Sequence, residues 1–168
     1  MSQSILGTGF RYDTEIIKPD GRVIADVDFN LLPQVSIDHI AGLIRGTASP
    51  IGSWYVGLFE GNYVPTSGVT SADLPATAVE CTAYSESARP AWTNAYDGVS
   101  VIDSLAAKAT FTLTIAKRVY GAFLVSAATK GGNTGLILSI ARFASPKDID
   151  AGEVFTVAAG LTLIPTSL

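Results

Sequence analysis

The sequence predicts a mainly β fold: an antiparallel β-sandwich or jelly roll with one short helix and an extended N-terminal arm. From residue 54 onward, apolar and polar residues alternate mostly with a period of two, which is typical of half-buried strands. About seven or eight such runs are joined by turns rich in Gly, Pro and Asn, as in antiparallel sandwiches. Because these runs do not alternate with long helical segments, a parallel doubly wound sheet is not expected.

The N-terminal part, residues 1–31, is expected to form an arm, and residues 32–168 the sandwich body. An extended segment around 10–17 is followed by the turn sequence Lys-Pro-Asp-Gly-Arg at 18–22, in which proline fixes φ and glycine supplies positive φ. The next run places alternate side chains on opposite faces: Val23, Ala25, Val27 and Phe29 against Ile24, Asp26, Asp28 and Asn30. The arm is therefore interpreted as a hairpin, or as two strands laid on something else.

One short helix is expected near 36–45, before the strands of the body. Ser36 can cap its N-terminus, and Gly46 can end it in the left-handed conformation. An apolar stripe follows the helical spacing and is formed by Ile37, Ile40, Ala41 and Ile44. This stripe predicts that the helix packs on a sheet.

The strands of the body are expected at 53–61, 78–84, 108–115, 119–126, 135–143 and 153–164, with long loops at 61–78 and 85–98. The clearest alternation is at 108–115, where Ala109, Phe111, Leu113 and Ile115 should face the core. Residues 119–126 and 135–143 are apolar on both faces, as expected of strands that are covered on both sides.

A glycine-rich stretch lies between two of these apolar runs, with Lys130 followed by Gly-Gly-Asn-Thr-Gly at 131–135. In a phosphate-binding loop the lysine follows the glycines and a helix begins there, because the helix N-terminus supplies N–H groups. Here the lysine comes first and strand-like residues follow. The stretch therefore predicts a hairpin turn, where glycine or asparagine adopts positive φ.

The composition favours a subunit of an assembly. Charged residues make up only 15% and apolar residues 48% of the 168-residue chain, which suits surfaces that partners cover. The apolar stretches are shorter than the ~20 residues of a membrane-spanning helix, so no membrane partner is expected. The net charge of −4, with scattered Lys and Arg, argues against nucleic acid. No secretory signal pattern is visible, and the single Cys81 agrees with production in a reducing cytoplasm.

Residues for catalysis are sparse. His39 is the only histidine, so a two-histidine metal site is impossible, and no Gly-x-Ser-x-Gly motif occurs. Asp148, Asp150 and Glu153 lack the spacing of a calcium loop and predict a solvated turn between strands. We therefore expect no enzyme activity and no catalytic, cofactor-binding or metal-binding residues.

Three runs carry a resemblance to a known class of proteins: "IGSWYVGLFEGNYVPT" from residue 51, "AVECTAYSESARPAW" from residue 78, and the stretch 108–157. Together they cover roughly residues 50–163, and Val119–Ser126 and Gly131–Pro146 are the most diagnostic parts. The chain resembles small virion proteins of tailed bacteriophages, in particular capsid decoration, or cement, proteins with a jelly-roll body. The resemblance implies a non-enzymatic protein, made in the bacterial host cytoplasm, that binds the outside of an icosahedral head and clamps major capsid subunits.

The expected partners are accordingly the major capsid protein and further copies of the chain, as a dimer or trimer. Contacts are expected from the arm and the two long loops, with these candidate interface residues: Phe10, Tyr12, Ile16, Ile17, Val23, Val27, Phe29, Tyr63, Trp92 and Tyr96. One alternative is a head–tail connector or tail-fibre component. Another, of a different class, is a carbohydrate-binding β-sandwich for host attachment, in which exposed aromatic side chains, Trp92 above all, would form the platform.

Overall fold

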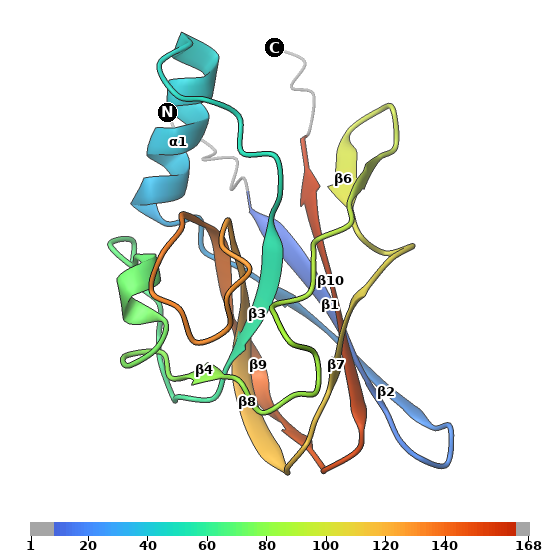
Figure 1. The fold of residues 1–168 in the computed structure, drawn as a ribbon. Coiled ribbons are helices and arrows are strands. Elements are labelled where there is room, and N and C mark those ends of the chain that lie inside the picture. Colours follow the sequence, from blue (N-terminus) through green and yellow to red (C-terminus); the bar gives the residue numbers. More distant parts are fainter. Residues whose placement is uncertain (1–8, 164–168) are drawn as a thin grey trace, which may run out of the picture.

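The computed structural model describes residues 9–163, which form two antiparallel sheets and one α-helix (Figure 1). The first sheet has six strands in the order β2-β1-β10-β6-β5, and β7 also pairs with β10. Its strands are β1 (Phe10–Ile17), β2 (Val23–Phe29), β5 (Ala95–Tyr96), β6 (Val101–Asp103), β7 (Ala109–Thr112) and β10 (Val154–Thr162). The first and last strands of the chain thus lie side by side.

The second sheet has four strands in the order β4-β3-β8-β9. Its strands are β3 (Tyr55–Phe59), β4 (Glu80–Cys81), β8 (Lys117–Val125) and β9 (Ile137–Ile149). A single 3₁₀ turn, η1 (Ser71–Asp73), precedes β4 and begins with a capping box between Thr70 and Asp73. The mainly β, antiparallel character predicted from the sequence is confirmed.

Apolar side chains from both sheets form one core between them. The first sheet contributes Phe10, Tyr12, Phe111 and Phe155, and the second contributes Val56, Leu58, Leu124 and Ala141. A smaller cluster lies on the other face of the second sheet, where Phe59, Phe123 and Ile140 pack against Val69 and Leu74 from the 61–78 loop. Residues 119–126 and 135–143 are therefore covered on both sides, as their apolar pattern predicted.

The N-terminal arm is the main correction to the predicted organisation. β1 is paired along its whole length with β10, from Phe10↔Leu161 to Ile17↔Val154, and on its other side with β2. Residues 10–29 therefore form the hairpin that was one of the two interpretations, but this hairpin belongs to the body's own sheet. Local alternation predicts a strand but not its partner, and here the partner is about 140 residues away. The remaining arm residues, 1–8, lie outside the described part.

The helix α1 (Gln34–Arg45) is confirmed, but its details differ from the prediction. The N-cap residue is Pro33, and Ser36 lies buried inside the first turn, while Gly46 ends the helix at φ 69° as expected. Most of the predicted packing stripe faces outward: Ile37, Ala41 and Ile44 are exposed and Ile40 is half-buried, whereas the residues buried in the helix are Ser36 and Gly42. Helical spacing shows that a stripe exists but not which way it points. None of the helices among residues 9–163 is long and apolar enough to span a membrane.

Two predicted strands end differently from the sequence pattern. At 108–115, Ala109, Phe111 and Leu113 are buried, but the pairing stops at Thr112 and Ile115 is exposed. β9 extends beyond 143 to Ile149, so the expected turn at 148–153 shrinks to the residues after β9. Between Arg142 and Lys147 this strand bulges, because four of its residues lie opposite one residue of β8.

Candidate interaction surfaces

Four predicted interface residues lie in the core and are unavailable to a partner in this structure. Phe10, Tyr12 and Ile16 point inward from β1, and Trp92 packs edge-on against Phe10. The Trp92 indole N–H donates to the backbone oxygen of Ala159 at 2.9 Å. Their place in the candidate interface is therefore a wrong prediction. A period-two pattern separates the two faces of a strand, but it does not say which face the protein covers.

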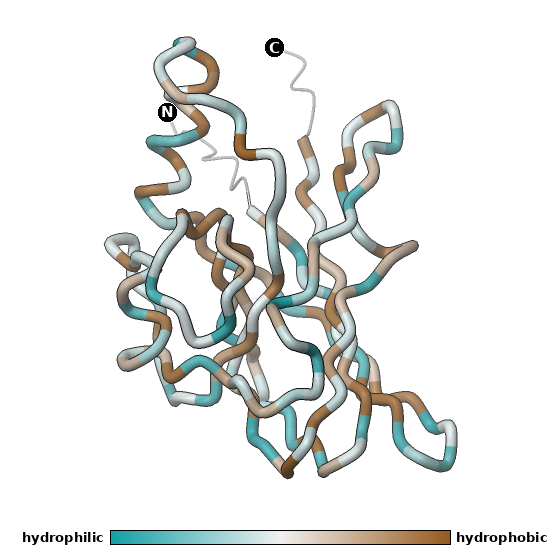
Figure 2. The backbone as a smooth tube through the Cα atoms, in the orientation of Figure 1, coloured by the Kyte–Doolittle hydropathy of each residue, from teal (hydrophilic) through white to brown (hydrophobic). Residues whose placement is uncertain are grey.

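The other candidates lie at or near the surface. Val23, Val27, Phe29 and Tyr96 are exposed, whereas Ile17 and Tyr63 are half-buried. Three of them belong to β2 and point to the same side as Ala25. We name this set the β2 stripe: Val23, Ala25, Val27 and Phe29. In Figure 2 the β1–β2 hairpin, at the lower right, carries brown apolar segments outside the core.

The β2 stripe lies on the outer face of the first sheet. Each of its residues is opposite an odd-numbered residue of β1, from Phe29↔Arg11 to Val23↔Ile17. Because the even-numbered side chains of β1 fill the core, the odd-numbered ones lie on the outer face. Phe29 is 75% exposed and Val23 50% exposed, so the stripe is a real apolar surface.

β2 is also an edge strand with free backbone groups. Lys18 N–H donates to Arg22 O at 2.9 Å, and Asn30 N–H donates to Phe10 O at 3.1 Å. Even-numbered residues of β2 therefore hydrogen-bond to β1, and the backbone groups of the β2 stripe point to the open edge. Within the described residues 9–163, one backbone N–H of the β2 stripe has a hydrogen-bond partner: the Val27 N–H donates to the Asp26 carboxylate at 2.8 Å.

The inner side of β2 is anchored by charge. The Lys147 ammonium contacts the Asp26 carboxylate and lies 3.8 Å from that of Asp28. Asp28 Oδ1 accepts the Ala144 N–H at 2.6 Å, from the bulge of β9. The hydrogen bond from Lys147 lowers the pKa of Asp26 below its ordinary range. These contacts hold β2 against the second sheet while its outer face stays open.

Helix α1 offers a second apolar surface, which we name the α1 face: Ile37, Ala41 and Ile44. Ile44 is 83% exposed, the largest exposure among the large apolar side chains in the described part of the chain. Beside the helix, an apolar groove of about 510 Å³ is lined by Ile40, Trp54 and Leu161, among others. Apart from the indole N–H groups, the polar side chain in this lining is that of Asn94. A substrate site usually needs several polar groups to fix the orientation of its ligand.

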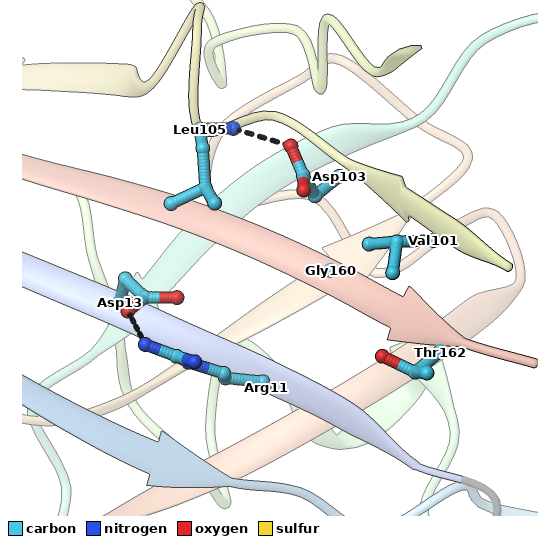
Figure 3. A pocket seen from close by; sticks show the side chains of 7 residues that line it. All are labelled: Arg11, Asp13, Val101, Asp103, Leu105, Gly160 and Thr162. Carbon is cyan, nitrogen blue, oxygen red and sulfur yellow. Dashed lines mark hydrogen bonds and ion pairs between the residues drawn. The ribbon is translucent and has the colours of Figure 1, made fainter. Parts of the chain in front are cut away.

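A smaller hollow of about 270 Å³ lies on the outer face of the first sheet, above Gly160 (Figure 3). Its charged groups already have partners within the chain. The Arg11 guanidinium contacts Asp13 at 2.6 Å, and the Asp103 carboxylate accepts the Leu105 N–H at 3.0 Å. The hollow therefore has few free groups to bind a ligand.

The glycine-rich stretch at 131–135 lies between the antiparallel strands β8 and β9, as predicted, but within a longer loop, 126–136, and not as a tight hairpin turn. Gly131 and Gly135 have φ 74° and 96°, and the strand pairing begins again at Val125 and Ile137. Lys130 points back into the protein, where its ammonium donates to the backbone oxygens of Tyr84 and Glu86 at 2.8 and 2.7 Å. The lysine is thus occupied by the protein itself and does not present a phosphate site.

A buried ion pair that the sequence did not reveal fixes this turn. The Arg89 guanidinium binds both oxygens of Glu80, at 2.8 and 2.6 Å. It also donates to the backbone oxygens of Ala127 and Gly132 at 2.8 and 2.9 Å. Glu80 accepts the Gly131 N–H at 3.0 Å. Glu80 lies in β4 and Arg89 in the loop that follows it, and no pattern in the sequence indicated that the two side chains would meet.

The described residues hold no group of three His, Cys, Asp or Glu side chains placed to bind a metal. His39 packs edge-on against Trp54, and its Nε2 is buried without a hydrogen-bond partner. Burial raises the pKa of the Cys81 thiol to about 11, so this cysteine is a poor nucleophile at neutral pH.

Comparison of the chain with protein-family models, with curated proteins and with solved structures finds no match. Its function is therefore inferred from its own residues.

Proposed function

We propose that this chain is a structural virion protein of a tailed bacteriophage: a decoration, or cement, protein with a β-sandwich body. It binds the outside of the icosahedral head and clamps neighbouring major capsid subunits. The observation that carries the proposal is the pair of apolar surfaces, the β2 stripe and the α1 face, on a chain whose groove is almost entirely apolar and whose hollow has charged groups that already have partners within the chain. Exposed apolar surfaces of this kind are typical of protein contacts.

The charges of the chain support contact by shape and apolar burial. Eight of its eleven Lys and Arg side chains form ion pairs with carboxylates of the same chain. Lys130 and Arg142 bind backbone oxygens instead. Few positive charges therefore remain for nucleic acid or another strongly acidic partner. The burial of Trp92 removes the main residue of the carbohydrate-binding alternative, and nothing else in the described chain favours that function.

The proposal is tested first by the copy number of the chain in purified virions, measured by quantitative mass spectrometry. A number comparable with that of the major capsid protein is expected. Only the few copies of a single vertex or tail would indicate a connector or tail-fibre component and would overturn the proposal.

A second test uses heads assembled without the chain, to which purified protein is added back. Wild-type protein should cosediment with the heads and raise the temperature at which they rupture. Ile44→Lys, on the α1 face, should weaken this binding, because a charge replaces an apolar contact. Ala116→Lys is the matched control, since it adds the same charge in the exposed turn between β7 and β8. Heads that are equally stable with and without the protein would refute clamping.

A further inference from the structure

The open edge of β2 is built to accept another strand. The strand has seven residues, and four of them direct their backbone groups away from β1. Edge strands with free N–H and C=O groups pair readily with another chain unless charge, proline or a covering loop blocks them. The β2 stripe contains no charge and no proline, and its side chains are exposed.

We propose that β2 pairs antiparallel with β2 of a second copy of this chain, about a two-fold axis at Asp26, so that two sheets join into one. This inference deepens the self-association expected of a cement protein, but it does not require the capsid contact. A two-fold axis gives a closed dimer in which the same surface is used by both copies.

The register follows from which backbone groups are free. Only odd-numbered residues of β2 present them, so an odd-numbered residue must lie opposite another odd-numbered one. An axis at Asp26 places Val23 opposite Phe29 and Ala25 opposite Val27. The two hydrogen-bonded pairs then recur by symmetry on the other side of the axis. Every residue of the β2 stripe is used, and the Val27 N–H would exchange the Asp26 carboxylate for the Ala25 carbonyl of the second copy.

The side chains match in the same register. In an antiparallel pair, directly opposite side chains lie on the same face, and aromatic residues opposite β-branched ones are favourable. Phe29 is the most exposed residue of the stripe, and it would lie against Val23 of the second copy. The smallest side chain, Ala25, would lie opposite Val27. The outer face of the joined sheet would thus carry a continuous apolar band across the axis.

The charges near the axis are partly compensated within each copy. Asp26 of one copy would face Asp26 of the other, and like charges directly opposite weaken pairing. Each Asp26, however, is already paired with Lys147 of its own chain, and this lysine also lies 3.8 Å from Asp28. Next to the stripe, Arg11 and Asp13 pair with each other, and Glu15 pairs with Lys108.

A second copy fits this edge better than an unrelated strand, because the match depends on the order of residues in β2 itself. The interface from one strand edge is at the small end of specific interfaces, so a reversible dimer is expected rather than a permanent one.

The test is sedimentation velocity of the purified full chain over a range of concentrations. Wild-type protein should show a monomer–dimer equilibrium. Phe29→Lys should raise the dimer dissociation constant by roughly 100-fold, because the symmetric interface loses two buried phenyl rings. Ile44→Lys is the matched control and should remain dimeric. Circular dichroism and thermal melting should show that both variants fold, since Phe29 and Ile44 are exposed in the monomer.

The register has its own test. Asp26→Cys should form a disulfide between two copies under mild oxidation, because residue 26 lies on the axis. Asp20→Cys, exposed in the β1–β2 turn and away from the axis, should form no disulfide between copies under the same conditions.

A wild-type chain that remains monomeric at every soluble concentration would overturn the pairing. So would a dimer that Phe29→Lys leaves intact or that Ile44→Lys disrupts. A monomeric chain whose Phe29→Lys variant fails to bind heads would assign the edge to another protein. If Phe29→Lys disrupts the dimer but the wild-type protein does not bind heads, the β2 pairing is supported and the proposed function is refuted.

Discussion

The buried pair of Arg89 and Glu80 should be the most sensitive point of the fold outside the apolar core. Both side chains are almost completely inaccessible, and the guanidinium also lies 5.4 Å from the ring centre of Phe123. Replacing Arg89 by Met keeps most of the volume but leaves the Glu80 carboxylate buried with the Gly131 N–H as its remaining donor. Two backbone oxygens of the turn also lose their donor.

Removing one partner of a buried ion pair costs about 3–5 kcal/mol, because the other charge stays in a low-dielectric site. A domain of this size is stable by only about 5–15 kcal/mol, so Arg89→Met should remove a large part of the free energy of unfolding. The expected fall in melting temperature is roughly 6–20 °C. Glu80→Gln should cost a similar amount for the mirror-image reason, since Arg89 then lacks its counter-charge.

The assay is urea denaturation followed by tryptophan fluorescence, completed as a double-mutant cycle. Arg89→Met with Glu80→Gln removes both charges and should be less destabilised than the sum of these two single variants, by about 2 kcal/mol. Arg118→Met is the control, because Arg118 pairs with Asp148 on the surface, where ion pairs contribute about 0–1 kcal/mol. If Arg89→Met costs no more than Arg118→Met, or if the single costs simply add, the reasoning is refuted.

Three further predictions follow from buried contacts. Burial alone would raise the pKa of Glu153, but hydrogen bonds from Lys18 and from a backbone N–H lower this pKa below its ordinary 4.5. The free energy of unfolding should therefore fall as the pH drops below about 4. Glu153→Gln should flatten that dependence in acid titrations. Gly121→Ala should prevent folding, because its Cβ would overlap a backbone oxygen of β9 and a ring of β3, whereas Gly68→Ala, with open space around it, should melt normally. Trp92→Ala should cost about 3–5 kcal/mol in denaturant titrations, as a core residue does; a change near zero would restore it as a surface contact.

The sequence predicted well the elements that depend on local pattern. Residues 53–61 contain β3, residues 119–126 overlap most of β8, and the loop at 131–135 uses glycines with positive φ, as its sequence predicted. What it could not give is the pairing of distant segments. The sequence predicted an arm at β1 because no residue near β1 in the chain indicates that β10 will pair with it.

The same limit explains the mixed result for the interface residues. Tyr12 and Val27 both lie in alternating strands, yet one is buried and the other exposed. Alternation separates the two faces of a strand, and only the tertiary structure decides which face is covered. The pairing of Arg89 with Glu80 was not predicted for a related reason: Glu80 lies in β4 and Arg89 in the loop after it, and only the tertiary structure brings the two side chains together.

The apolar surfaces and the internal pairing of charge have one consequence in common. Among residues 9–163, Arg45 at the end of α1 is the one Lys or Arg side chain with neither a carboxylate nor a backbone oxygen bound to it. Contacts made through the β2 stripe and the α1 face would therefore gain little from long-range attraction between charges. Salt screens exposed charges but leaves apolar burial largely intact. Self-association and binding to a shell through these surfaces should thus both persist at high ionic strength, which is the behaviour that a protein holding a particle together requires.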